Sequence, residues 1–124
     1  METGRLSRMT RAAALLVFLA ACGGALGDPV DVSQAIPLAE ALALPRPAEV
    51  TLRGEVQEVC RSSGCWFVLR ETSGADFADL YVDLQPRASF RLDASAVGHT
   101  AVVSGTLVGE GPDSALHAAG LRLE

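Results

Sequence analysis

The stretch Val59-Cys60-Arg61-Ser62-Ser63-Gly64-Cys65-Trp66-Phe67 holds two of the three cysteines of the chain and its one tryptophan. Four residues separate these two cysteines, and their composition, with glycine in the last place, is typical of a turn. Runs with β-strand character flank the turn, Val50–Val59 before it and Cys65–Arg70 after it. The sequence therefore predicts a β-hairpin whose tip carries both cysteines.

The strand before the turn has a period of two. Apolar residues or glycine alternate with polar residues from Val50 to Gln57, which is typical of a strand with one buried face. The alternation breaks at Val59, so we expect a β-bulge near Glu58. The strand after the turn has apolar side chains on both faces, and we expect it to be central in its sheet.

Three more strands complete the predicted fold. They are expected at Leu80–Leu84, Thr100–Val108 and Ala115–Leu123, with a turn at Thr72–Ala75 and an irregular connection before the fourth strand. This order predicts an all-β fold, a small five-stranded OB-like Greek-key barrel. A small β-sandwich is the competing architecture.

Two glycines inside predicted strands favour the barrel. Glycine normally weakens the interior of a strand, and its natural use there is a sharp bend at a barrel corner. Gly54 and Gly105 are therefore predicted to mark such bends.

The N-terminus has the pattern of a secretory signal. Three arginines precede the apolar run Ala12–Leu19, which is shorter than the roughly 20 apolar residues that span a bilayer. The run ends in Leu19-Ala20-Ala21-Cys22, which resembles the lipobox of bacterial lipoproteins. The resemblance implies that Cys22 is acylated and becomes the first mature residue, which anchors the chain stably in a membrane. An ordinary signal with a chance cysteine is the alternative.

Three regions follow from this reading. Residues 1–21 are expected to be the signal peptide, 22–47 a lipidated tether and short helix, and 48–124 the OB-like β domain. The tether is expected at Gly23–Val32 and the helix from Pro37, packed on the domain as a lid. Gly23 after the lipidated cysteine resembles known sorting patterns for the outer membrane, so in a cell that has one we expect the domain on the outer membrane, facing the periplasm.

Charge bears on the partners. Without Glu2 and the three arginines of the signal, the chain has 14 acidic and 7 basic residues, a net charge of −7. An exported, net negative domain lacks the electrostatic footprint of a nucleic-acid binder. We expect no nucleic-acid partner; the expected partners are the membrane, through the anchor at Cys22, and an unknown protein or small ligand.

Cys60 and Cys65 have three candidate roles. Export puts them in an oxidising compartment, where a hairpin disulfide is the default and would stabilise the domain by roughly 2 kcal/mol. The alternative is a periplasmic metal-handling protein that binds Zn or Cu through both thiols, with His99 or His117 as further ligands. If Val108 pairs with Ala115, however, His117 faces Thr106 and the two histidines lie at opposite ends of the last hairpin.

Enzymatic chemistry is the weakest of the three roles. Redox enzymes favour Cys-x-x-Cys at a helix N-terminus, whereas here the spacing is longer and the context is a hairpin. The sequence has neither a Gly-x-Ser-x-Gly elbow nor a His-Glu-x-x-His motif. We therefore expect a binding or scaffolding domain with no catalytic residue and no cofactor. Trp66 is expected in the core with its N–H bonded to a carbonyl, and a ligand-stacking role is the alternative.

The run Gly54–Trp66 resembles a domain family of unknown function found in bacterial secreted proteins and lipoproteins. The signature of that family is Gly-x-Val-x-x-Val-Cys, four residues, then Cys-Trp, with glycine before the second cysteine. The resemblance covers roughly Ile36–Leu123 and implies an OB-like fold without an established activity. This chain departs from the family at Phe67, where methionine is usual, and at Ser62-Ser63, where basic residues are common.

Overall fold

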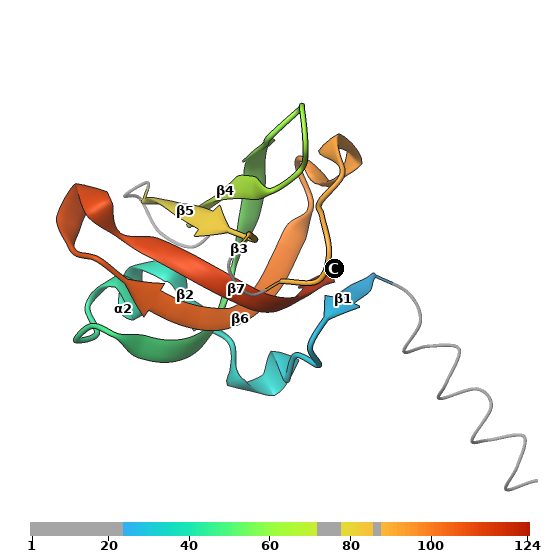
Figure 1. Ribbon diagram of the computed structural model, residues 1–124. Helices are drawn as coiled ribbons and strands as arrows, with labels where there is room; N and C mark the ends of the chain where they lie inside the picture. The colour runs from blue at the N-terminus through green and yellow to red at the C-terminus, as the bar shows by residue number, and fades with distance from the viewer. Residues whose placement is uncertain (1–23, 72–77, 86–87) are drawn as a thin grey trace, which may run out of the picture.

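The barrel strands lie where the sequence predicts them. The computed structural model describes residues 24–71, 78–85 and 88–124 (Figure 1). The strands of the barrel are β3 (Ala48–Val59), β4 (Trp66–Arg70), β5 (Asp79–Asp83), β6 (Thr100–Val108) and β7 (Ala115–Leu123). Short 3-10 turns at Val32–Gln34, Ala94–Ala96 and Gly111–Asp113 lie in the connections.

These five strands close on themselves. β3 pairs antiparallel with β4 and with β6, β4 pairs antiparallel with β5, and β6 pairs antiparallel with β7. A parallel pairing of β5 with β7 completes the ring. The all-β fold and the five-stranded OB-like Greek-key barrel are thereby confirmed, and the sandwich alternative is wrong. β4 lies between β3 and β5, as its two apolar faces predict.

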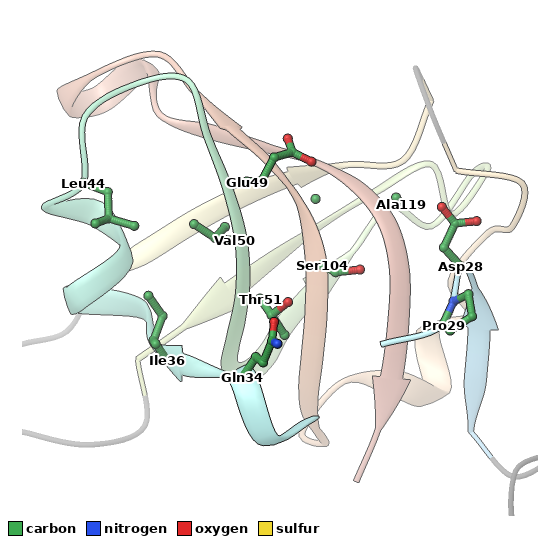
Figure 2. A pocket seen from close by; sticks show the side chains of 11 residues that line it. Asp28, Pro29, Gln34, Ile36, Leu44, Glu49, Val50, Thr51, Ser104 and Ala119 are labelled. Carbon is green, nitrogen blue, oxygen red and sulfur yellow. The ribbon is translucent and has the colours of Figure 1, made fainter. Parts of the chain in front are cut away.

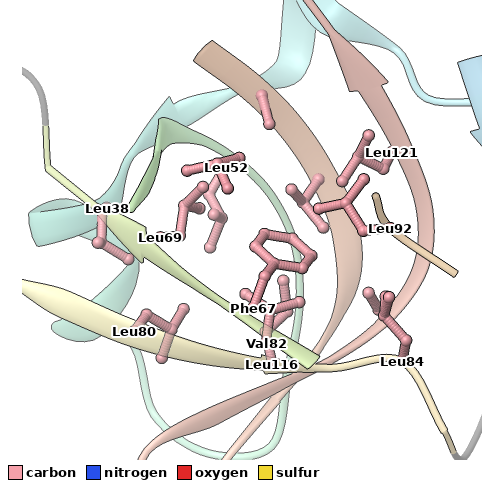
Figure 3. Packing of buried hydrophobic residues seen from close by; sticks show 14 of the residues in the cluster. Leu38, Leu52, Phe67, Leu69, Leu80, Val82, Leu84, Leu92, Leu116 and Leu121 are labelled. Carbon is pink, nitrogen blue, oxygen red and sulfur yellow. The ribbon is translucent and has the colours of Figure 1, made fainter. Parts of the chain in front are cut away.

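The core of the barrel is built from the inward-pointing residues of every strand (Figure 3). Because side chains alternate across a strand, every second residue points inward. Fully buried members include Leu52, Val56, Phe67, Leu69, Leu80, Val82, Val103, Leu107, Leu116 and Leu121. Phe67 is the largest of them.

The predicted bulge and the two predicted glycine positions have physical causes in the packing. The register of β3 against β4 shifts between Val56 and Glu58, which confirms the bulge. A Cβ atom on Gly105 would stand 2.3 Å from the carbonyl oxygen of His117, and the register of β6 against β7 shifts at this point. A Cβ atom on Gly54 would stand 2.7 Å from Cγ of Leu69. Both glycines therefore allow a neighbouring strand to approach closely.

The N-terminal segment corrects one prediction. The expected tether at Gly23–Val32 is wrong from Ala25 onward, because β1 (Ala25–Gly27) pairs antiparallel with β7 and Leu26 packs against the core. Three residues are too few to show a period in the sequence, and their partner edge exists only once the barrel has formed.

The short helix covers one side of the barrel, as predicted. β2 (Ile36–Pro37) pairs parallel with β3, and α2 (Leu38–Leu42) follows it. The helix starts one residue later than predicted, with Pro37 as its N-cap. Leu38 and Ala41 are fully buried. The carboxylate of Glu71 accepts a hydrogen bond of 2.8 Å from the backbone N–H of Ala39 and thereby caps a free donor of the first helical turn.

The signal peptide and Cys22 lie outside the described residues, as does the predicted turn at Thr72–Ala75. Within the described ranges, no helix combines the length and apolar character needed to cross a bilayer.

Candidate functional site

The turn that carries both cysteines is fixed by backbone hydrogen bonds. The N–H of Gly64 donates to the carbonyl of Cys60 at 2.9 Å, and the N–H of Cys60 donates to the carbonyl of Trp66 at 3.0 Å. Gly64 has φ of +63°, and a Cβ atom there would stand 2.4 Å from the carbonyl oxygen of Leu92. The N–H of Leu92 in turn donates to the carbonyl of Gly64 at 3.0 Å. Only glycine fits this position, so the turn is held against the connection between β5 and β6.

The two thiols of the turn share one serine hydroxyl. Both cysteines are half-buried free thiols in the structure. The hydroxyl of Ser63 donates to Sγ of Cys65 at 2.9 Å and lies 3.5 Å from Sγ of Cys60. The disulfide between Cys60 and Cys65 stays a prediction for the oxidised protein.

Cys60 is set up to carry a negative charge. Its Sγ lies 3.4 Å from the hydroxyl of Ser62, in addition to the Ser63 contact. Hydrogen bonds from these two hydroxyls, followed by bonds from the backbone of the same residues, lower the pKa of Cys60 to about 6. A thiol with that pKa is mostly thiolate at neutral pH, and the thiolate is the reactive form of cysteine.

Next to the turn lies a stacked aromatic pair on the outside of the barrel. The rings of Trp66 in β4 and Tyr81 in β5 have centroids 5.7 Å apart and planes 28° apart. In the strand register Trp66 faces Asp83 and Val68 faces Tyr81, so the two rings meet as diagonal neighbours. Tyr81 is 42% exposed, and Trp66 is less exposed but still in contact with solvent.

The position of Trp66 corrects the expectation that it lies in the core. Phe67 takes the inward position instead, and the pleat then turns Trp66 outward. Because both faces of the predicted strand are apolar, the sequence pattern does not decide which of the two aromatic residues points inward.

The aromatic pair and the thiols form one electrostatic neighbourhood. Burial raises the pKa of Tyr81, and the negative charges of Asp83, Cys65 and Cys60 raise it further. Further along the same face, Arg70 donates two hydrogen bonds, of 2.8 and 3.1 Å, to the carboxylate of Asp79. Asp83 and the two cysteines therefore bring negative charge to the surface around the rings, and Arg70 on the same face is paired with Asp79.

The two histidines lie apart, as the pairing argument predicts. His117 faces Thr106 across β6 and β7, and Val108 faces Ala115. His99 precedes the start of β6, at the far end of that hairpin. In the part of the chain that the structure describes, no three or more His, Cys, Asp or Glu side chains come together as metal ligands would. Cys60 and Cys65 thus lack a third ligand of these types among those residues.

A second surface feature is an open pocket of about 440 Å³ (Figure 2). Its walls come from the segment before α2, from β3 and from the bulged part of β6, and they include Asp28, Gln34, Glu49 and Ser104. None of the cysteine-turn residues lines it. The sequence pattern misses this pocket because one wall belongs to the segment read as a tether.

Sequence reasoning also missed Tyr81 and the two serines as members of the site. The signal for Tyr81 is present, because an aromatic residue alternates there with Leu80 and Val82, which are buried. Ser62 and Ser63 count only as turn formers in the sequence, and their contacts with the thiols depend on the fold of the turn.

Comparisons with known proteins support the fold and go no further. No protein-family model and no curated protein matches the chain. Among solved structures, the chain is similar to one described as the hypothetical protein ygiW from E. coli, with a TM-score of 0.52 and 20% sequence identity. The match covers 79% of this chain and 98% of that one. At this identity the likeness bears on the OB-like barrel alone.

Proposed function

We propose that this protein is an exported binding domain without catalytic activity, anchored in a membrane by lipid on Cys22. Its ligand face is the outer surface of β4 and β5 with the turn Cys60–Cys65. In the oxidising compartment that the signal peptide implies, Cys60 and Cys65 form a disulfide. The outer membrane, facing the periplasm, is the expected address.

The stacked pair of Trp66 and Tyr81 supports this proposal most. In OB barrels the second and third strands and the loops between the first and second and between the fourth and fifth strands carry the ligand. Here those strands are β4 and β5, and the first of those loops is the cysteine turn. The two rings lie on the outer face of these strands, are at least partly exposed and do not contribute to the core. They therefore offer a surface on which a ligand can stack.

The charge of the face indicates what kind of ligand it accepts. Asp83, which lies opposite Trp66, opposes phosphate, and the chain after the signal has a net charge of −7. A ligand whose ring stacks on Trp66 and Tyr81 and carries no negative charge avoids this repulsion. We propose a neutral oligosaccharide, a ligand class that OB barrels bind on this face.

The single tryptophan makes the test direct. Titration of the protein with an N-acetylglucosamine tetramer should change the fluorescence of Trp66 in a saturable manner. Tyr81→Ala should weaken binding at least tenfold by the same readout, and Trp66→Ala should abolish it in calorimetry. Val97→Ala, an exposed apolar residue elsewhere on the surface, is the matched control.

Two outcomes would count against this function. Absence of carbohydrate binding at millimolar concentration would reject the ligand class. Micromolar binding of single-stranded DNA with a steep salt dependence would contradict the whole charge argument, because such a slope reports released counterions.

The anchor has its own test. Cys22→Ser should abolish lipid labelling and release the protein into the soluble fraction. A variant that still requires detergent for its extraction would reject the lipobox reading.

A further inference from the structure

We propose that Cys60 and Cys65 form a redox-active dithiol, in which Cys60 attacks low-molecular-weight disulfides and Cys65 resolves the mixed disulfide. This inference goes beyond the binding function above and does not depend on the oligosaccharide. It gives the turn a chemistry of its own, with a named nucleophile and a named resolving residue.

The first support is the set of donors around Cys60. Hydroxyls of Ser62 and Ser63 lie 3.4 and 3.5 Å from its Sγ, and the backbone of the same two residues also acts on it. Cys60 is partly exposed and residues 61–63 are exposed, which gives a small disulfide a path from solvent to the sulfur. An accessible thiol surrounded by donors is typical of a reactive cysteine, whereas structural cysteines are buried and inert.

The second support is the position of Ser63. Its hydroxyl contacts both sulfurs, at 2.9 Å from Cys65 and 3.5 Å from Cys60. Both sulfurs therefore contact one small group within a six-residue turn. In the proposed reaction, Ser63 rotates aside and Cys65 then approaches a group carried on Cys60.

The reaction balances without a further cofactor. The thiolate of Cys60 attacks one sulfur of a disulfide RSSR, the S–S bond of RSSR breaks, and one RS⁻ leaves. Cys65 then loses its proton to solvent and attacks Sγ of Cys60, which releases the second RS⁻ and forms the Cys60–Cys65 disulfide. The protein is oxidised by two electrons and RSSR is reduced to two thiols; a dithiol reductant reverses both steps.

The same contacts make the resulting disulfide easy to reduce. A thiolate at Cys60 can only accept a hydrogen bond from the hydroxyl of Ser62. Oxidation removes the thiolate and with it this hydrogen bond, so the contact stabilises the reduced form alone. Selective stabilisation of the reduced form makes a disulfide a stronger oxidant. The pair is thus labile, unlike a disulfide whose role is to hold a fold together.

The experiment uses the chain with Cys22→Ser, which leaves only the two thiols of the turn. After reduction, it is mixed with oxidised glutathione and followed by intact mass. The chain with both turn cysteines should end as an internal disulfide, two hydrogens lighter, with released glutathione. Cys65→Ser should accumulate a mixed disulfide with one glutathione, which peptide mapping places on Cys60.

The pH dependence of the rate separates a prepared nucleophile from an ordinary thiol. In the Cys65→Ser background, the rate should rise with a midpoint near pH 6, the pKa of Cys60. Cys60→Ser removes the proposed nucleophile and should leave little mixed disulfide under the same conditions. Ser62→Ala and Ser63→Ala should shift the Cys60 midpoint upward, whereas Ser95→Ala, an exposed serine outside the turn, should leave it in place.

Three results would overturn the proposal. One is a pH–rate midpoint for Cys60 at the ordinary thiol pKa of about 8.5 instead of near pH 6. Another is an oxidised protein that glutathione reduces only in denaturant, which would make the disulfide structural. The third is a rise in the melting temperature of the reduced protein on addition of Zn²⁺ with protection of both thiols, which would make the pair a metal site.

Discussion

The two faces of β4 carry similar residues and do different things. Phe67 and Leu69 point inward, are fully buried and fill the barrel. Trp66 and Val68 point outward and are partly exposed, and Trp66 stacks on Tyr81 of the next strand. The pleat of β4 thus assigns consecutive residues to different roles. Inward residues build the core, and outward residues belong to the candidate site. Substitutions on the inner face should therefore lower the free energy of unfolding strongly. Substitutions on the outer face should lower it little and should instead affect ligand binding.

The largest expected effect is on the inner face. Phe67→Ala should lower the free energy of unfolding by about 3–5 kcal/mol, because it removes the largest fully buried side chain and leaves a cavity. Urea denaturation followed by circular dichroism measures this. For a domain of this size such a loss approaches the whole stability.

The matched control stays on the same face. Leu69→Met keeps the volume roughly constant and should cost less than about 1.5 kcal/mol. Equal effects of the two substitutions would show that the inner face of β4 is not tightly packed.

The next effect concerns the close approach of β6 and β7. Gly105→Ala should cost about 1–3 kcal/mol, because the new Cβ meets backbone, 2.3 Å from the carbonyl oxygen of His117, and backbone cannot rotate away. Thermal unfolding with Ser104→Ala as control should separate the two neighbours. A Gly105→Ala protein as stable as the parent would mean that β6 shifts freely against β7.

The sequence was sufficient for the strands of the barrel because their signals are local and repeated. Each signal reports on burial or packing along one strand: the alternation in β3, β6 and β7, the break at Val59, and the glycines Gly54 and Gly105 inside strands. Together they predict five strands and a bulge, whereas the closure of the sheet, which the sandwich alternative left open, is shown by the pairing of β5 with β7.

The candidate site was less predictable because it depends on contacts between strands. Cys60 and Cys65 stand out by residue type and spacing. The contact of both sulfurs with the hydroxyl of Ser63, however, depends on the geometry of the folded turn. Trp66 was expected in the core because tryptophan is most often a core residue, and the apolar pattern on both faces of the strand did not distinguish it from Phe67. β1 was missed because its pairing with β7 is a property of the folded barrel.

On the outer face, the stacked rings should contribute a modest coupling. A double-mutant cycle with Trp66→Ala and Tyr81→Ala should give a coupling of about 0.5–1.5 kcal/mol, the range for aromatic pairs. The cycle is measured by urea denaturation, with signals from circular dichroism because Trp66 is itself replaced. A coupling near zero would mean that the rings touch without mutual stabilisation and would weaken the case for a preformed stacking surface.

The smallest effect is expected from the last outward residue of β4. Arg70 and Asp79 face each other across β4 and β5, but their side chains are 38% and 47% exposed, so water and salt screen the pair. A double-mutant cycle with Arg70→Ala and Asp79→Ala should give about 0.2–1 kcal/mol at neutral pH. The guanidinium of Arg70 lowers the pKa of Asp79 below its ordinary value, so the folded state holds this proton less tightly than the unfolded state. The coupling is therefore fully present above the ordinary carboxyl pKa of about 3.9 and is lost as pH falls through the lower pKa of the folded state. A coupling that persists at a pH where Asp79 is protonated would mean that packing of the Arg70 side chain, and not its charge, holds this corner of the outer face.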